Sequence, residues 1–103
     1  MYIGKTEINK QWQRLDALIQ AQVSGQSSFA FDADTTYQLQ GEGSAGVCLC
    51  ETEQAPSDKS DGFVIRGTQC ANYKPTSGLH LWVKVAEYPM SALALLKIAT
   101  LGE

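Results

Sequence analysis

Apolar positions near the N-terminus recur at the spacing expected of an α-helix. The intervals between them are four, three, four and four residues, which places them on one stripe of a helix. The stripe consists of Ile8, Trp12, Leu15, Ile19 and Val23. Thr6 is suited to cap the N-terminus of such a helix, and Gly25 is suited to end it. The pattern therefore predicts one amphipathic helix between Thr6 and Gly25.

After Gly25 the apolar positions change to the alternation of β-strands. They alternate around Phe29 and Phe31 and then around Tyr37 and Leu39. Further short runs, "GVCLCETE", "FVIRGTQCANY" and "LHLWVKVAE", are separated by the turn-forming segments "GEGSAG", "QAPSDKSDG" and "KPTSG". The second run is expected to break at Gly67. The closing run, "ALALLKIATL", is predicted to be a strand because short strands precede it at regular spacing, although Ala and Leu favour helices.

These elements predict a mainly β protein. One helix followed by about six short strands is typical of a small antiparallel β-sandwich or barrel with an N-terminal amphipathic α-helix. A chain of 103 residues has no room for a second hydrophobic core. We expect residues 1–25 to form a helix and anchor segment and residues 26–103 to form the β-sandwich domain.

The strand predicted over residues 79–87 has two distinct faces. Alternation places four aliphatic residues on the core face, namely Leu79, Leu81, Val83 and Val85. His80 and Trp82 lie on the opposite face, near Tyr73 and Tyr88 in the sequence. Aromatic side chains with a polar tip are enriched at interfaces, so these four residues are a candidate ligand or interface surface. The alternative is that the N-terminal helix covers Trp82.

The three cysteines and the single histidine raise the question of a metal site. Cys48, Cys50, Cys70 and His80 are of the right types for tetrahedral zinc. Zinc sites normally use pairs of cysteines two to four residues apart, whereas Cys48 and Cys50 are separated by one residue on a predicted strand. We therefore expect cysteines that pack in the sheets, and no metal or cofactor.

Charge and composition exclude several classes of function. The net charge is −3 and the basic residues are scattered, which argues against nucleic acid as a partner. No apolar run approaches the length of a membrane span. The N-terminal residues lack the pattern of a secretory signal, and the odd number of cysteines does not fit a disulfide framework, so synthesis in the cytoplasm is expected. Without a catalytic motif, a non-enzymatic protein is predicted.

Two segments resemble a family of small bacteriophage virion proteins. The segment "WQRLDALIQAQVSGQSSFAFDADTTYQLQGEGSAGVCLCETEQAPSDKSDGFVI" is similar to the arrangement in that family of an N-terminal helix, a "tY.lQ" strand and a "v.lce" strand. The end, "YKPTSGLHLWVKVAE" followed by an apolar strand, looks like the family's "y.p..g..lwvk" finish. The similarity extends from about Trp12 onward and consists of turns and alternation. It identifies no binding residue, and it does not require Cys48 and Cys50.

The resemblance implies a structural part of a virion. It implies a capsid-decoration, tail or connector component with a β-sandwich fold and no enzymatic activity, located in the virion and made in the host cytoplasm. Its partners would be capsid, portal or tail proteins and further copies of itself, for example in a trimer. Independently of the resemblance, the predicted helix is too short to be stable alone, so it must dock either on the sheet of its own chain or on neighbouring subunits. Docking on neighbouring subunits is favoured, and the candidate contacts are then Ile8, Trp12, Leu15 and Ile19. The alternative function is a carbohydrate- or receptor-binding module displayed on a virion.

Overall fold

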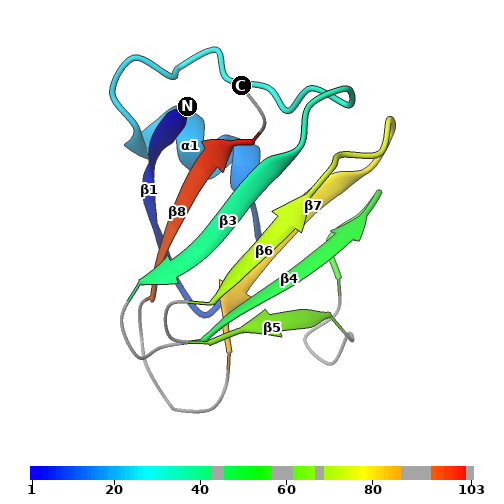
Figure 1. Cartoon of the computed structure of the whole chain (residues 1–103). Helices are drawn as coiled ribbons and strands as arrows, with labels where there is room; N and C mark the ends of the chain where they lie inside the picture. Colours follow the sequence, from blue (N-terminus) through cyan, green and yellow to red (C-terminus); the bar gives the residue numbers. More distant parts are fainter. Residues whose placement is uncertain (43–45, 57–61, 67–68, 87–93, 102–103) are drawn as a thin grey trace.

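The chain folds into two antiparallel sheets with one short helix beside them (Figure 1). The computed structural model describes residues 1–42, 46–56, 62–66, 69–86 and 94–101. The elements are β1 (Tyr2–Ile8), β2 (Gln13–Arg14), α1 (Leu15–Gln22), β3 (Tyr37–Glu42), β4 (Val47–Thr52), β5 (Phe63–Ile65), β6 (Cys70–Tyr73), β7 (His80–Val85) and β8 (Ala94–Thr100). Four strands form the first sheet in the order β1-β8-β3-β6, and four form the second sheet in the order β2-β7-β4-β5. The prediction of a mainly β, sandwich-like protein is confirmed.

The core lies between the two sheets. Along β3, Tyr37 and Leu39 are buried while Gln38 and Gln40 are half-buried, which is the predicted alternation. β8 is a strand, as predicted for the closing segment, and it buries Leu96 and Ile98 between the sheets. It also lies in the interior of the first sheet, because it pairs with β1 on one side and with β3 on the other. Its apolar inner face and its two neighbours explain why Ala and Leu, which favour helices, accept the strand conformation here.

The predicted N-terminal helix is wrong over its first half. Residues Tyr2–Ile8 form strand β1, and the helix begins only at Leu15. Thr6 does not cap a helix, since its side chain is fully buried on the inner face of β1. The apolar spacing that suggested one helix joins residues of two separate elements. β-branched residues such as Thr6 and Ile8 favour strands, and the edge of β8 provides the partner that β1 requires.

The helix that does form, α1, is short and depends on the core. It has 8 residues and buries Leu15, Leu18 and Ile19 in the same hydrophobic core as the strands. Isolated helices of this length are unstable in water, so packing must supply the stability of α1. Gly25, the predicted stop, has a φ of 82°, in the left-handed region that favours glycine. The helix, however, ends at Gln22 with Val23 as its C-cap, so Gly25 lies in the turn that follows the helix and does not end the helix itself.

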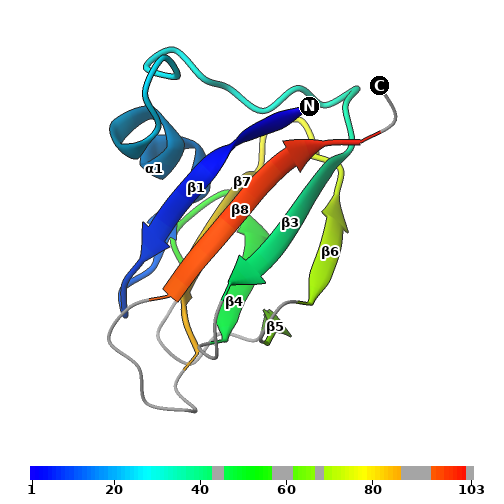
Figure 2. The same cartoon turned by 60° about the vertical axis from the view of Figure 1, so that its left-hand side comes forward.

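The boundary expected at residue 25 does not separate two structural units. β1 is hydrogen-bonded to β8 near the other end of the chain, and the apolar residues of α1 belong to the one core. α1 lies beside β1 and closes the side of the sandwich between β1 and β7 (Figure 2). Residues 1–25 are thus part of the β-sandwich, and the division into an anchor segment and a separate domain is wrong.

The segment predicted to be a strand around Phe29 and Phe31 is a loop. Its two phenylalanines pack edge-to-face, with ring centroids 5.0 Å apart, and Phe31 also contacts the rings of Tyr37 at 4.9 Å and Tyr73 at 5.4 Å. The Gln20 side chain of α1 donates a hydrogen bond to the Phe29 carbonyl oxygen at 2.7 Å. The alternation seen in the sequence arises because both phenylalanines turn toward one aromatic cluster at the end of the core.

The run "FVIRGTQCANY" divides into two strands of different sheets. β5 pairs with β4 in the second sheet, whereas β6 pairs with β3 in the first. The chain therefore crosses between sheets where the break was predicted; Gly67 itself lies outside the described residues. As a result β5 and β6 are both outer strands, and they lie on the side of the sandwich opposite α1.

Candidate functional site

The predicted oligomer contacts are mostly core residues. Ile8, Leu15 and Ile19 each have an exposed fraction of 0%, and all three belong to the hydrophobic core of the chain itself. Their side chains cannot also contact a second subunit while the chain is folded, so the expected docking of a helix stripe on a neighbour is wrong. Trp12 is half-buried, and its ring centroid lies 5.1 Å from the Nζ atom of Lys84, in a cation–π contact that covers part of β7.

Three of the four residues of the candidate ligand surface are described, and they lie on two different sheets. His80 and Trp82 lie on the outer face of β7, as the alternation predicted, and both are half-buried. The Trp82 indole N–H donates a hydrogen bond to the Thr52 carbonyl oxygen at 3.2 Å. Tyr73 lies on β6 in the other sheet, and Tyr88 lies outside the described residues. Tyr73 and His80 line a common cavity.

That cavity, here named the end cleft, lies where the turn before β7 meets the start of α1. It has a volume of about 290 Å³, and its lining includes Arg14, Asp16, Phe31, Tyr73 and His80. The Arg14 guanidinium donates two hydrogen bonds to Asp16, from Nε to Oδ1 at 3.1 Å and from Nη2 to Oδ2 at 2.7 Å. The charged groups of the cleft therefore pair with each other, which lowers their capacity to attract a charged ligand.

Glu51 joins the two sheets beside the end cleft. It lies on β4, and its carboxylate accepts hydrogen bonds from the Tyr73 hydroxyl at 2.9 Å and from the Thr76 backbone N–H at 2.9 Å. The Thr76 hydroxyl is a third donor, at 3.2 Å. Burial and the hydrogen bond to Glu51 raise the pKa of Tyr73 well above its usual range. Tyr73 therefore stays protonated as a donor near neutral pH, and Glu51 acts as a structural acceptor.

The cysteines do not assemble with His80. Cys48 and Cys50 are half-buried on the outer face of β4, whereas Cys70 is exposed on the outer face of β6, on the opposite side of the sandwich. Among the residues that the structure describes, no three His, Cys, Asp or Glu side chains are grouped closely enough to hold a metal ion. The alternation along β4 directs Val47 and Leu49 toward the core and both cysteines away from it. Their position explains why the zinc interpretation has no geometric basis.

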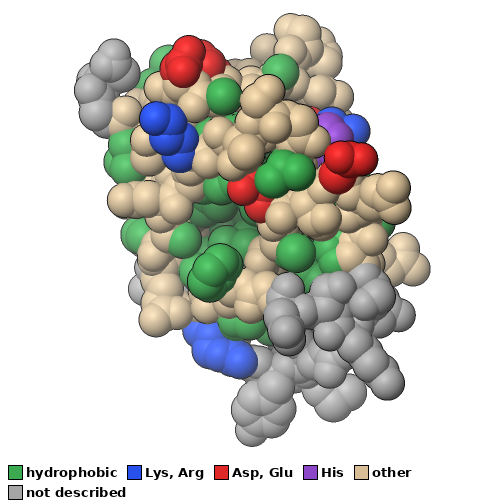
Figure 3. Space-filling view, turned by 90° about the vertical axis from the view of Figure 1, so that its right-hand side faces the viewer, with side chains coloured by type: hydrophobic (Ala, Val, Ile, Leu, Met, Phe, Trp, Pro, Cys, Tyr) green, Lys and Arg blue, Asp and Glu red, His purple; other side chains and the backbone are tan. Residues whose placement is uncertain are grey.

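A second hollow, the edge groove, lies between the outer strands β5 and β6 and was not expected from the sequence. It has a volume of about 390 Å³, and its floor includes Leu39, Leu49, Ile65 and Leu81. Hydrophobic side chains gather in a hollow at the middle of this face (Figure 3). Its lining also includes Phe63, whose side chain is 80% exposed.

The orientation of Phe63 makes this exposure unusual. Phe63 lies directly opposite Leu49 in the β4–β5 pair, and residues opposite each other in an antiparallel pair point to the same face of the sheet. Leu49 is buried, with 5% of its side chain exposed, so Phe63 is an inner-face residue that the sandwich leaves uncovered. A sequence pattern can predict the face of a strand residue, but it cannot show that the opposite sheet ends before covering it.

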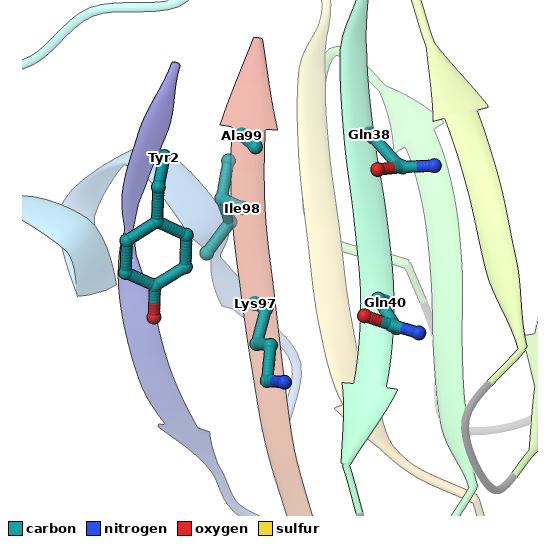
Figure 4. Close-up of a pocket in the computed structure, with 6 residues that line it drawn as sticks. All are labelled: Tyr2, Gln38, Gln40, Lys97, Ile98 and Ala99. Carbon is teal, nitrogen blue, oxygen red and sulfur yellow. The ribbon is translucent and has the colours of Figure 1, made fainter. Parts of the chain in front are cut away.

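A third hollow lies on the outer face of the first sheet (Figure 4). This trough has a volume of about 320 Å³ and is lined by Tyr2, Gln38, Gln40, Lys97, Ile98 and Ala99. None of these residues was predicted to form a site. The signal available in the sequence was the alternation of glutamines with apolar residues in β3, which places Gln38 and Gln40 on one polar face.

Comparison with known proteins identifies no relative: no family model, no curated protein and no solved structure matches the chain. Among the described residues, no helix is long and apolar enough to cross a membrane. The functional conclusion therefore depends on the residues and on the geometry of the hollows.

Proposed function

We propose that this protein is a non-enzymatic structural component of a bacteriophage virion, of the capsid-decoration, tail or connector type. It acts through protein–protein contacts with other copies of itself or with capsid, portal or tail proteins. The observation that carries the proposal is the edge groove, an apolar hollow bordered by two outer strands. The resemblance of the sequence to small virion proteins supports the same conclusion.

The edge groove has the features of a protein contact. Within the described residues, no strand pairs with the outer edge of β5 or β6, so backbone donors and acceptors there are available to a neighbouring chain. Phe63 and Val64 are 80% and 40% exposed, and β5 contains neither a charged residue nor proline to discourage pairing. Exposed apolar patches of this kind mark interaction sites in soluble proteins.

The rest of the molecule is consistent with a subunit that folds by itself and assembles with other proteins afterwards. Both sheets and α1 contribute to one core that the chain completes by itself. A chain with only 18% charged residues offers little electrostatic repulsion to a neighbouring subunit. The proposed location is the virion, after synthesis in the host cytoplasm.

The test is incorporation into particles. The phage that encodes the chain is grown with wild type, Phe63→Ser or Tyr2→Ser, and purified virions are quantified by mass spectrometry. Because Phe63 is exposed, Phe63→Ser is expected to keep the fold and to lower incorporation by about tenfold, as the loss of an aromatic contact at an interface does. Tyr2→Ser is the matched control, since Tyr2 is also exposed but lies on another face.

Two outcomes contradict different parts of the proposal. Absence of the wild-type chain from mature virions would eliminate the structural role. Normal incorporation of the Phe63→Ser variant would leave that role standing and eliminate the edge groove as the contact. The surface predicted for the alternative, a carbohydrate- or receptor-binding module, is divided between the sheets, because Tyr73 lies on β6 and Trp82 lies on β7.

A further inference from the structure

We propose that the trough on the outer face of the first sheet binds an uncharged saccharide. The proposal does not depend on the role of the chain in a virion. It is carried by the arrangement of one exposed aromatic ring, two amide side chains and a low floor between them.

The walls of the trough come from strands on either side of β8. Tyr2 on β1 and Gln38 on β3 are both paired with Ala99, from opposite sides. Neighbouring strands are about 4.8 Å apart, which separates the backbones of the two walls by about 10 Å. Between Tyr2 and Gln38 the floor is low because the β8 residue paired with both of them is Ala99, whose side chain is a single methyl group. Figure 4 shows Tyr2 on one side of β8 and Gln38 and Gln40 on the other.

One wall offers a surface for the C–H face of a sugar ring. The Tyr2 side chain is 60% exposed, so much of its ring is available for contact. A saccharide has an apolar face of C–H groups and an edge of hydroxyls, and an aromatic ring with a polar tip complements such a ligand at a wet surface. Tyr2 therefore provides the apolar contact of the site.

The other wall offers paired donors and acceptors. Gln38 and Gln40 are two residues apart on β3, which places their side chains on the same face about 7 Å apart. Each amide carries two donor hydrogens and one acceptor oxygen, and a sugar hydroxyl is likewise both donor and acceptor. Among the described residues, none forms a hydrogen bond with the Gln38 amide. The Gln38 amide thus matches a sugar hydroxyl better than it matches an anion, which only accepts.

The charges around the trough favour a neutral ligand. Lys97, at one end, lies 3.3 Å from Glu42, and Lys5 lies 3.2 Å from the same carboxylate. Hydrogen bonds from Lys5 and Lys97 lower the pKa of Glu42, so this carboxylate remains ionised and offsets one of the two positive charges. An anionic ligand would have to displace Glu42 from Lys97. Lys97 can donate to a neutral hydroxyl without breaking that pair.

The experiment screens the full-length chain against an array of neutral and acidic oligosaccharides and measures the affinity of the best binder by isothermal titration calorimetry. We expect a neutral oligosaccharide to bind. We expect Tyr2→Ala, which removes the ring, to weaken the binding by about tenfold. Ala99→Leu, which fills the floor without removing a polar group, is expected to weaken binding at least as much. Phe63→Ser is the control, because Phe63 is also an exposed aromatic residue but lies in the edge groove.

The result can overturn the proposal in three ways. No binding of any neutral oligosaccharide would eliminate it, as would binding confined to acidic glycans. Equal loss of affinity in Phe63→Ser and Tyr2→Ala would also eliminate it, because the ligand would then not lie in the trough. Circular dichroism of each variant confirms that the fold is kept, and both Tyr2 and Ala99 are accessible enough to be replaced without loss of core packing.

Discussion

At the scale of single residues, Glu51 and Tyr73 connect the two halves of the sandwich. The apolar contacts of the core hold the two sheets together but are not directional. The hydrogen bond from the Tyr73 hydroxyl to Glu51 is directional, and it fixes the position of β6 relative to β4. Glu51 receives three donors, and a carboxylate that is removed from water needs such partners. The pair therefore orders the sheets near the end cleft and beside the edge groove.

Replacement of Tyr73 by Phe should lower stability by a measurable amount. The variant keeps the aromatic contact with Phe31 but deprives Glu51 of one donor, which costs about 1–2 kcal/mol in the free energy of unfolding. Urea denaturation monitored by circular dichroism measures the difference, and Tyr2→Phe is the control at an exposed tyrosine. Equal stability of Tyr73→Phe and wild type would show that Thr76 alone satisfies Glu51.

The same variant should change the response to alkaline pH. The pKa of Tyr73 is raised in the folded protein, so the folded state favours the protonated phenol. Its contribution to stability is complete below the pKa of an unfolded tyrosine, about 10, and is lost as the pH rises above that value. The wild type should therefore lose more stability than Tyr73→Phe between neutral pH and pH 11. An equal loss of stability in the wild type and in Tyr73→Phe between neutral pH and pH 11 would contradict this expectation.

At the scale of elements, α1 protects an open strand edge. β1 is an outer strand of the first sheet, and its Glu7 backbone N–H donates to the Gln22 side-chain oxygen at 2.7 Å. The Gln22 amide nitrogen in turn donates to the Glu7 carbonyl oxygen at 3.1 Å. The Gln22 amide thus takes the place of a neighbouring strand and blocks pairing with another chain. β5 and β6 have no such cover in the described residues, which distinguishes the two sides of the sandwich.

Replacement of Gln22 by Leu should release this edge. Both hydrogen bonds to Glu7 are lost while the helix propensity of the position is kept, so α1 is expected to open from β1 more often. The amide of Glu7 should then exchange its hydrogen about tenfold faster, at a cost of about 1 kcal/mol in stability. Ala21→Leu, an exposed change on the same helix, is the control. Unchanged exchange at Glu7 in the Gln22→Leu variant would show that the edge is closed by packing alone.

At the scale of the whole molecule, the first and the last strand of the chain pair with each other. β1 and β8 pair along their length, and the Met1 amino group donates to the Thr100 carbonyl oxygen at 3.1 Å. The radius of gyration is 12.6 Å, close to the value of about 13 Å expected for a compact domain of this size. Contacts between residues so far apart in sequence mean that the sandwich forms as one unit.

Removal of residues 1–25 should therefore unfold the protein. The truncation deletes β1, β2 and α1 and uncovers Leu96 and Ile98, which are fully buried in the complete chain. The loss of this packing exceeds the stability of a domain of this size, about 5–15 kcal/mol, so unfolded or aggregated material is expected. Circular dichroism and size-exclusion chromatography provide the measurement. A truncated chain that remains folded and monomeric would instead show that the N-terminal segment is a tether.

Much of the sheet structure followed from local pattern. Alternation in residues 37–42, 47–52 and 80–85 identified three strands and the face that each buries, because side chains in a strand point alternately to its two sides. The helix start could not be predicted in this way. Ile8 and Leu15 fit one helical stripe, but they enter the same core from two different elements. The helical spacing of apolar residues is informative only when all of them belong to one element. Pairing with β8 makes Tyr2–Ile8 a strand, and this tertiary contact decided where the first element ended.

The sequence by itself determined that the chain is mainly β and which positions of its strands are apolar, because these are consequences of local propensity and period. Only the tertiary structure decided which of those positions are covered. Phe63 and Leu49 carry equally apolar side chains on the same inner face, yet one is 80% exposed and the other 5%. Likewise Tyr2 meets Gln38 and Gln40 only because β8 lies between β1 and β3. Exposure and the meeting of distant residues depend on the order of strands in a sheet, which local periodicity does not specify.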